Sequence, residues 1–181
     1  SPELEARRRR YHEELGLSEE HAELLTREEA WADLFEAALG AGASPVGVAN
    51  WVINELPREI GDRTLENLPF GGADLGRLVQ LVEDGTLSSS AAREVLAEMV
   101  TGGETPDAIV ERRGLQQIND EAALAPIVEQ VVGANAAKAE EYRAGRTGLI
   151  GFFVGQVMRQ TGGKANPELV RRLLEARLAQ P

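Results

Sequence analysis

The sequence predicts an all-helical chain that folds as two helical bundles. Aromatic residues make up only 4% of it, and valine, isoleucine and threonine rarely alternate with polar residues. Apolar residues instead recur every three or four positions, which is the period of an amphipathic helix. A chain of 181 residues with 43% hydrophobic content can bury one large core or two small ones.

Glycine and proline divide the chain into segments. We expect a helical domain at residues 1–60, a linker at 61–72, and a second bundle made of two small subdomains at 73–118 and 119–181. The linker is assigned because prolines and glycines gather there and interrupt the helical period.

The first domain contains four expected helices, each marked by an N-cap or a terminating glycine. They are residues 2–15 ended by Gly16, a helix capped by Ser18, a helix from the Thr26 capping box to Leu39, and a helix from Ser44-Pro45 to Leu56. Arg7 to Arg10 cover the whole circumference of the first helix, so we expect them to be solvated or to pair helices, with nucleic-acid contact as the alternative. Trp31 and Trp51 are expected in the core.

The helices expected in the second bundle are also marked by N-caps and terminating glycines. Its expected helices are Leu75 to Val82, Ser88 to Met99, a short helix opened by Thr105-Pro106, and a helix capped by Asn119-Asp120-Glu121 that runs through Val131. Asp120 and Glu121 could be imagined as an acid and base pair, but capping explains them, because nothing nearby presents a nucleophile.

The stretch from Arg143 to Val170 is the least ordinary part of the chain. In a helix, its apolar residues from Leu149 to Met158 would cover most of the circumference, so we expect this helix to be surrounded by protein at the centre of its bundle. The remaining sector carries Gly148, Gly151 and Gly155, and each glycine costs about 1 kcal/mol relative to alanine. Either a second helix crosses there at close range, which we favour, or the glycine face admits the backbone of a ligand.

Basic residues flank this helix in the sequence. Residues 143–181 hold seven Lys or Arg against two Glu, whereas the whole chain has a net charge of −11. Such an acidic total argues against a nucleic-acid partner, but the acid is concentrated toward the other end of the chain, so RNA can approach the basic end.

The segment after the helix predicts a hairpin with a basic loop. Gly162-Gly163 ends one helix, and Asn166 caps the next, with Pro167 at its first position. Gly-Gly-Lys is not a phosphate-binding P-loop, because Met158 stands where its first glycine would be and Ala165 where Ser or Thr would hold magnesium.

No catalytic or metal-binding constellation is visible. The chain has no cysteine, which excludes thiolate metal sites and fits a cytoplasmic location. His12 and His21, the only histidines, lack nearby metal-ligand spacing and are expected at the surface. No apolar run approaches the roughly 18 residues of a membrane span, so we expect no membrane partner. We assign no catalytic residue, no metal and no cofactor.

Several strings resemble one protein family. Residues 142–170, which read YRAGR and then GFFVGQVMRQTGGKANPELV, look like the signature of the GatB/YqeY tail domain. LVEDGTLSSSAAREVLAEMV at 81–100 and GLQQIND at 114–120 look like other parts of that tail, and ANW at 49–51 looks like the helical segment that precedes it. The resemblance covers nearly the whole chain.

The resemblance implies a tRNA-binding appendage of an enzyme that forms aminoacyl-tRNA. In this family the tail holds tRNA, of the glutamine or asparagine type, while the chemistry occurs elsewhere in the parent enzyme. The parent would be the B subunit of an Asp/Glu-tRNA amidotransferase or a glutaminyl-tRNA synthetase, and the acidic first domain and divergent linker slightly favour the synthetase. DNA is not an expected partner.

Physical reasoning places the RNA contacts on phosphates and sugars, with the glycine face allowing close approach. The expected contacts are Arg143, Arg146, Gly151, Gly155, Arg159, Lys164, Asn166, Arg171 and Arg172. No set of aromatic residues for base stacking is evident, so shape should matter more than sequence. The competing hypothesis is a docking domain that binds partner subunits, through the glycine face or the acidic first bundle, without touching RNA.

Overall fold

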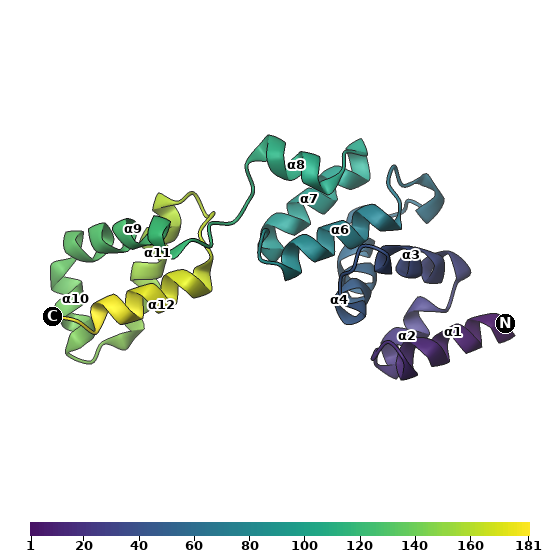
Figure 1. The fold of residues 1–181 in the computed structure, drawn as a ribbon, viewed down its shortest axis with the longest axis horizontal. Coiled ribbons are helices and arrows are strands. Elements are labelled where there is room, and N and C mark those ends of the chain that lie inside the picture. The colour runs from purple at the N-terminus through teal and green to yellow at the C-terminus, as the bar shows by residue number, and fades with distance from the viewer. The chain divides into compact units, whose positions relative to one another are not determined.

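The computed structural model describes residues 1–181, and its regular structure is helical (Figure 1). The one β-type pairing is an isolated parallel bridge between Ile118 and Ala165. The all-α fold class is therefore confirmed. None of the helices has the length and apolar character that crossing a membrane requires.

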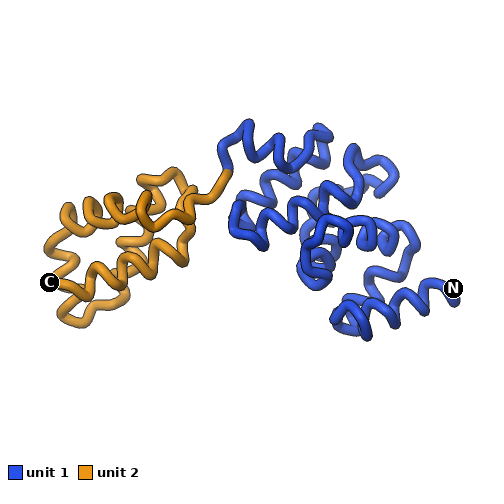
Figure 2. The backbone as a smooth tube through the Cα atoms, viewed as in Figure 1, with its two compact units in different colours: residues 1–115 blue, residues 116–181 orange.

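The chain divides into two compact units, residues 1–115 and residues 116–181 (Figure 2). Unit 1 contains α1 (Pro2–Glu13), α2 (Glu19–Leu25), α3 (Glu29–Leu39), α4 (Pro45–Asn50), the π-helical turn η1 (Trp51–Glu55), α5 (Leu56–Ile60), the 3-10 turn η2 (Leu65–Asn67), α6 (Gly72–Glu83), α7 (Ser89–Gly102) and α8 (Pro106–Arg113). Unit 2 contains α9 (Glu121–Ala134), α10 (Ala136–Arg143), the 3-10 turn η3 (Thr147–Leu149), α11 (Ile150–Gln160) and α12 (Pro167–Leu178).

A single hydrophobic core runs through unit 1. Phe35 and Trp51, which precede the expected linker, belong to the same buried cluster as Leu78 and Leu96, which follow it. The segment 61–71 itself is tied to α7, because the guanidinium of Arg63 donates to the carbonyl of Val100 at 2.7 Å. The two compact units divide after Leu115, near the subdomain boundary expected at 118 and 119, whereas the helices on either side of the expected linker at 61–72 share one core.

Two glycines allow α6 to pack closely against α3. A Cβ atom on Gly76 would lie 2.1 Å from the carbonyl oxygen of Ala38, and one on Gly72 would lie 2.5 Å from the Cβ of Ala37. No side chain fits in either space. The close helix crossing that glycine permits is therefore found in unit 1.

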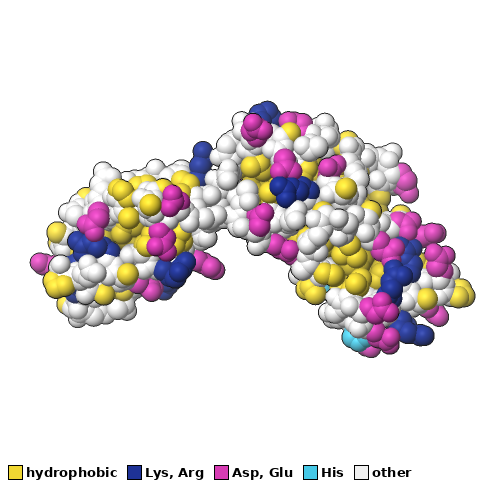
Figure 3. All heavy atoms as spheres, viewed as in Figure 1, with side chains coloured by type: hydrophobic (Ala, Val, Ile, Leu, Met, Phe, Trp, Pro, Cys, Tyr) yellow, Lys and Arg dark blue, Asp and Glu magenta, His cyan; other side chains and the backbone are white.

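Arginines of α1 pair this helix with α3. Arg7, which is only 8% exposed, donates to Asp33 at 2.8 Å and to Glu36 at 2.7 Å. Arg10 also pairs with Glu36, and its guanidinium carbon lies 5.6 Å from the centre of the Tyr11 ring. Figure 3 shows basic and acidic side chains interleaved on the surface near the N-terminus. Helix pairing is thus confirmed for Arg7 and Arg10.

The capping box expected at Thr26 is wrong. Helix α3 begins at Glu29, without a side-chain cap, and Thr26 is buried. The Thr26 hydroxyl donates to the carbonyl of Ala22 at 2.7 Å, so this residue closes α2 instead of opening α3. A threonine hydroxyl can satisfy backbone groups at either end of a helix, and the sequence signal does not distinguish the two roles here.

Unit 2 is a small bundle of α9, α11 and α12 with α10 alongside. Its core contains Leu124 and Val128 from α9, Phe153 from α11, and Val170 and Leu174 from α12. Asp120 caps α9 through its carboxylate, which accepts from the backbone N–H of Ala122 at 2.9 Å. The capping interpretation of Asp120 is therefore confirmed.

Candidate functional site

Helix α11 is buried on one face only. Ile150, Phe153 and Val157 form the buried face, whereas the flanking apolar residues Phe152 and Met158 are partly exposed. The expectation that this helix is surrounded by protein is therefore wrong. An apolar count around the helix circumference overestimates burial, because side chains at the flanks of a buried face are apolar without being fully covered.

The glycines of this region lie on the open face. Gly148, Gly151 and Gly155 are exposed, and a Cβ atom added to any of them would meet nothing within 4 Å. None has the positive φ that would demand glycine. No second helix crosses here, so the favoured explanation of Gly151 and Gly155 is contradicted. Neither packing nor backbone conformation within the chain accounts for them.

The loop after α11 returns to the end of that helix. Gly162 and Gly163 have φ angles of +61° and +77°, which let the chain reverse. The Gly162 N–H donates to the carbonyl of Arg159 at 3.1 Å, and the Lys164 N–H donates to the carbonyl of Thr161 at 3.1 Å. Arg159 and Lys164 therefore emerge from the same end of α11, just beyond the glycine face.

Three of the expected RNA-binding cations in unit 2 are unpaired. Arg159, Lys164 and Arg172 are exposed, and their side chains make no hydrogen bond, ion pair or ring contact with the rest of the chain. Each presents a full charge to an incoming anion. The C-terminal end of α11 also favours cations, so Arg159, in its last turn, stabilises the helix as well.

The other expected cations have partners within the unit. Arg143 donates from Nε to the carbonyl of Leu178 at 3.0 Å, Arg146 pairs with Glu141 at 3.3 Å, and Arg171 pairs with Glu175 at 2.9 Å. Exposed ion pairs of this kind contribute little to stability, so a phosphate can replace Glu141 or Glu175 at small cost. Arg146 and Arg171 are therefore available, but less directly than the unpaired cations, whereas Arg143 would have to leave the carbonyl of Leu178.

Both polar atoms of the Asn166 side chain have partners within unit 2. Its Oδ1 accepts from the N–H groups of Glu168 at 3.0 Å and Leu169 at 3.3 Å, which confirms it as the cap of α12. Its Nδ2 donates to Oδ1 of Asn119 at 2.9 Å. Asn166 therefore shapes the loop that carries Lys164.

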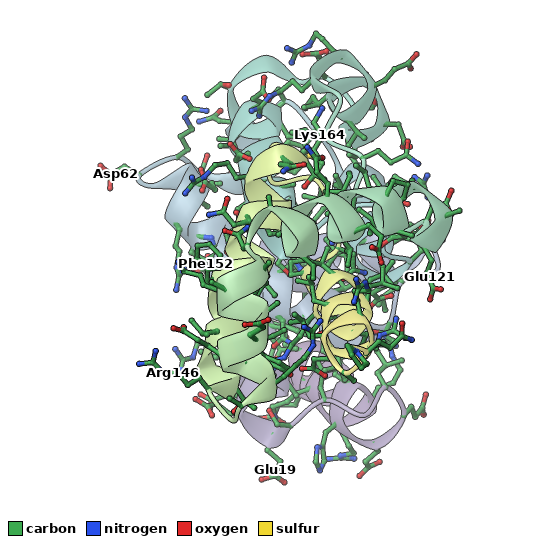
Figure 4. The ribbon with its side chains drawn as sticks, turned by 90° about the vertical axis from the view of Figure 1, so that its left-hand side faces the viewer. Glu19, Asp62, Glu121, Arg146, Phe152 and Lys164 are labelled. Carbon is green, nitrogen blue, oxygen red and sulfur yellow. The ribbon has the colours of Figure 1, made fainter.

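Sequence reasoning missed Lys138 and Phe152. The Nζ of Lys138, on α10, lies 4.9 Å from the centre of the Phe152 ring, and Phe152 borders the glycine face on α11. Figure 4 shows Phe152 and Arg146 pointing outward on one side of the unit, with Lys164 toward one end and Glu121 on the other side. A cation–π contact between residues on two helices leaves no signal in the sequence, so Lys138 could not be assigned in advance.

Unit 1 carries ion pairs that hold helices together. Arg77 makes two hydrogen bonds to Asp107, at 2.9 and 3.0 Å, and Glu98 accepts from both Arg112 and Arg113. The hydrogen bond from Arg112, aided by Arg113, lowers the pKa of Glu98 below its ordinary value. No group of His, Cys, Asp or Glu residues in the chain is arranged to hold a metal ion.

The chain is an all-helical module of two units, and residues 33–178 match the family described as the GatB domain. The chain belongs to this family. It is 45% identical over 180 residues to the B subunit of the aspartyl/glutamyl-tRNA(Asn/Gln) amidotransferase of Thermosynechococcus vestitus, and 44% identical to that of Geobacter sulfurreducens. The alignments cover 98% of the chain but only 36% and 38% of these relatives, so the chain spans about a third of their length.

Proposed function

We propose that the chain is the part of an amidotransferase B subunit that holds tRNA, through the open face of α11 and the cations around it. The names of the relatives favour this parent over a glutaminyl-tRNA synthetase. A tRNA(Asn) or tRNA(Gln) substrate follows from the same names.

The observation that carries the proposal is an uncompensated cost in α11. Gly155 lies in the interior of α11 and Gly151 in its first turn, and each lowers helix stability by up to about 1 kcal/mol relative to alanine. Alanine would fit at both positions, since nothing lies within 4 Å of the added atom. A bare backbone beside unpaired cations is what a ligand with a bulky anionic backbone requires, because it can approach closely and find positive charge there.

The contacts expected from this geometry are mainly electrostatic. Arg159, Lys164 and Arg172 supply unpaired charge, and Lys138 adds a fourth cation beside the glycine face. The aromatic ring of Phe152 borders that face, and Lys138 already lies over it. Recognition by phosphate position and RNA shape therefore suits this surface better than stacking of several bases.

A salt titration of tRNA binding tests the proposal. We expect the affinity of the chain for unmodified tRNA to fall linearly with salt on a log–log plot, and Lys164→Gln to make the slope shallower by about 0.7–0.9. Arg58→Gln is the matched control, because it removes the same charge from an exposed, unpaired arginine of unit 1. Binding that is independent of salt, or equal slope changes in the two variants, would contradict the proposal.

A second candidate function, docking to a protein partner, is favoured by one feature of unit 1. Leu24, Trp31, Ile53 and Pro57 line a shallow groove of about 180 Å³. An apolar partner bound there would be insensitive to Lys164→Gln and only weakly sensitive to salt. The same titration therefore separates the two functions.

A further inference from the structure

The connector between α8 and α9 is attached to unit 1 near its first residue and to unit 2 near its last. The Leu115 N–H donates to the carbonyl of Val110 at 3.1 Å, and the Leu115 side chain packs against the core of unit 1. Ile118 packs against the core of unit 2. Only Gln116 and Gln117 lie between these two anchored residues.

On the side of unit 2, the connector is hydrogen-bonded to the loop that carries Lys164. The Ile118 N–H donates to the carbonyl of Lys164 at 2.7 Å, and the Asn166 N–H donates to the carbonyl of Ile118 at 3.0 Å. These two bonds form the isolated bridge of the fold and enclose Ala165, which is 1% exposed. The backbone on both sides of Ala165 is thereby fixed to the connector.

A side-chain bond extends this attachment. Nδ2 of Asn166 donates to Oδ1 of Asn119, while Oδ1 of Asn166 caps α12. One asparagine therefore joins the connector, the Lys164 loop and the first turn of α12. The loop needs such support, because the two residues before Lys164 are glycines, which have the greatest backbone freedom of any residue.

We propose that Ile118 and Asn119 are positioning residues of the RNA-binding face, which hold Lys164 where it meets a phosphate. This inference rests on the proposed function. Asn119 contributes through Asn166 and Lys164, not by contacting RNA. Fixing the loop in advance lowers the conformational entropy lost on binding, and the same linkage requires that bound RNA stabilises the connector bonds.

A double-mutant cycle tests the inference. Asn119→Ala should raise the Kd for tRNA by about 2- to 10-fold at fixed salt, which is the range expected when a neutral hydrogen bond such as that to Asn166 is lost. In the Lys164→Gln background the same change should have little further effect, since the residue it positions is gone. Asn135→Ala is the control, because it removes a side-chain hydrogen bond of similar length, 2.8 Å to the carbonyl of Val131, elsewhere in unit 2.

The outcomes distinguish this inference from the proposed function. Equal weakening by Asn119→Ala in both backgrounds, or an equal effect of Asn135→Ala, would overturn the positioning role while leaving RNA binding intact. If the affinity of the unmodified chain for tRNA does not depend on salt, the proposed function itself is overturned.

Amide exchange in the unmodified chain gives a second test that needs no variant. The Ile118 and Asn166 amides donate the two bridge bonds. We expect saturating tRNA to slow their hydrogen exchange several-fold, while exchange of the Leu115 amide, on the side of unit 1, stays unchanged. Unchanged exchange at Ile118 and Asn166 in the presence of bound tRNA would overturn the inference.

Discussion

Replacing glycine with alanine should have opposite effects on the stability of the two units. Gly76 and Gly151 both lie within helices, at α6 and α11, and neither has a positive φ angle. Alanine improves helix propensity by about 1 kcal/mol at either position. The surroundings of the added methyl group therefore decide the sign of the effect.

At Gly151 nothing lies within 4 Å of the new atom, so we expect Gly151→Ala to stabilise unit 2 by about 0.5–1 kcal/mol. At Gly76 the new atom would lie 2.1 Å from the backbone oxygen of Ala38. Helices α3 and α6 would have to separate by about 1 Å, and overpacking of this kind costs typically 1–3 kcal/mol and occasionally more. Gly76→Ala should therefore destabilise unit 1 by about 1–3 kcal/mol.

The positions of the tryptophans allow the two units to be followed separately. Trp31 and Trp51 both lie in unit 1, and the chain has no other tryptophan. Urea unfolding followed by tryptophan fluorescence reports on unit 1, whereas far-ultraviolet circular dichroism reports on both units. A loss of 2 kcal/mol lowers the fluorescence midpoint by about 1 M, since m is about 1–3 kcal/mol per M for small domains.

Each half of this reasoning can fail separately. A fluorescence midpoint that stays the same or rises in Gly76→Ala would show that α3 and α6 do not pack as closely as described. A dichroism transition of unit 2 that moves to lower urea in Gly151→Ala would show that the glycine face of α11 has an internal partner.

Two further results are expected. Gly155→Ala should stabilise unit 2 but raise the Kd for tRNA. The control is Gly133→Ala, which adds a methyl group in open space on α9 and should leave the Kd for tRNA unchanged. Equal Kd values for the two variants would show that the glycine face is not part of the binding surface. Glu98 has a lowered pKa because Arg112 and Arg113 donate to it, so its stabilising contribution is present above the ordinary carboxyl pKa of about 4.3 and is lost as pH falls through the lowered value. The difference in unfolding free energy between Glu98→Gln and the unmodified chain, measured by fluorescence, should therefore be constant near neutral pH and shrink below about pH 4. A difference that persists at lower pH would contradict the stabilising role of the bonds from Arg112 and Arg113 to the Glu98 carboxylate.

Local signals in the sequence were sufficient to find most helix ends. The side chains of Ser18, Ser44, Ser88 and Thr105 each accept a backbone N–H in the first turn of a helix, as expected of N-caps. Such a bond involves residues two or three positions apart, so the sequence contains both partners. The pattern fails at Thr26, where the hydroxyl bonds to the preceding helix instead.

The environment of the glycines could not be predicted in the same way. Gly151 and Gly155 have the spacing of a helix-crossing motif, as Gly72 and Gly76 do, but only the second pair has a neighbour. What distinguishes them is a helix more than thirty residues away in the chain, α3, whose small residues face Gly72 and Gly76. Spacing alone carries no information about that partner.

The candidate site shows the same limit of sequence reasoning. The pair of Arg171 with Glu175 has helical i, i+4 spacing and is visible in the sequence. The contact of Lys138 with Phe152, and the bonds from Ile118 to the Lys164 loop, join distant segments and depend on the folded bundle. The sequence identified the basic loop, but not the residues that hold it in place.

The shared core of unit 1 determines how the protein can be dissected. A truncation anywhere within 61–72 would separate Phe35 and Trp51 from Leu78 and Leu96, and would leave apolar surface of both fragments in water. Fragments cut there should aggregate, and their failure to bind RNA would say nothing about function. A cut between Leu115 and Gln116 leaves each core whole and keeps Ile118 with the loop that it supports, so it is the boundary to choose for separate expression of the two halves.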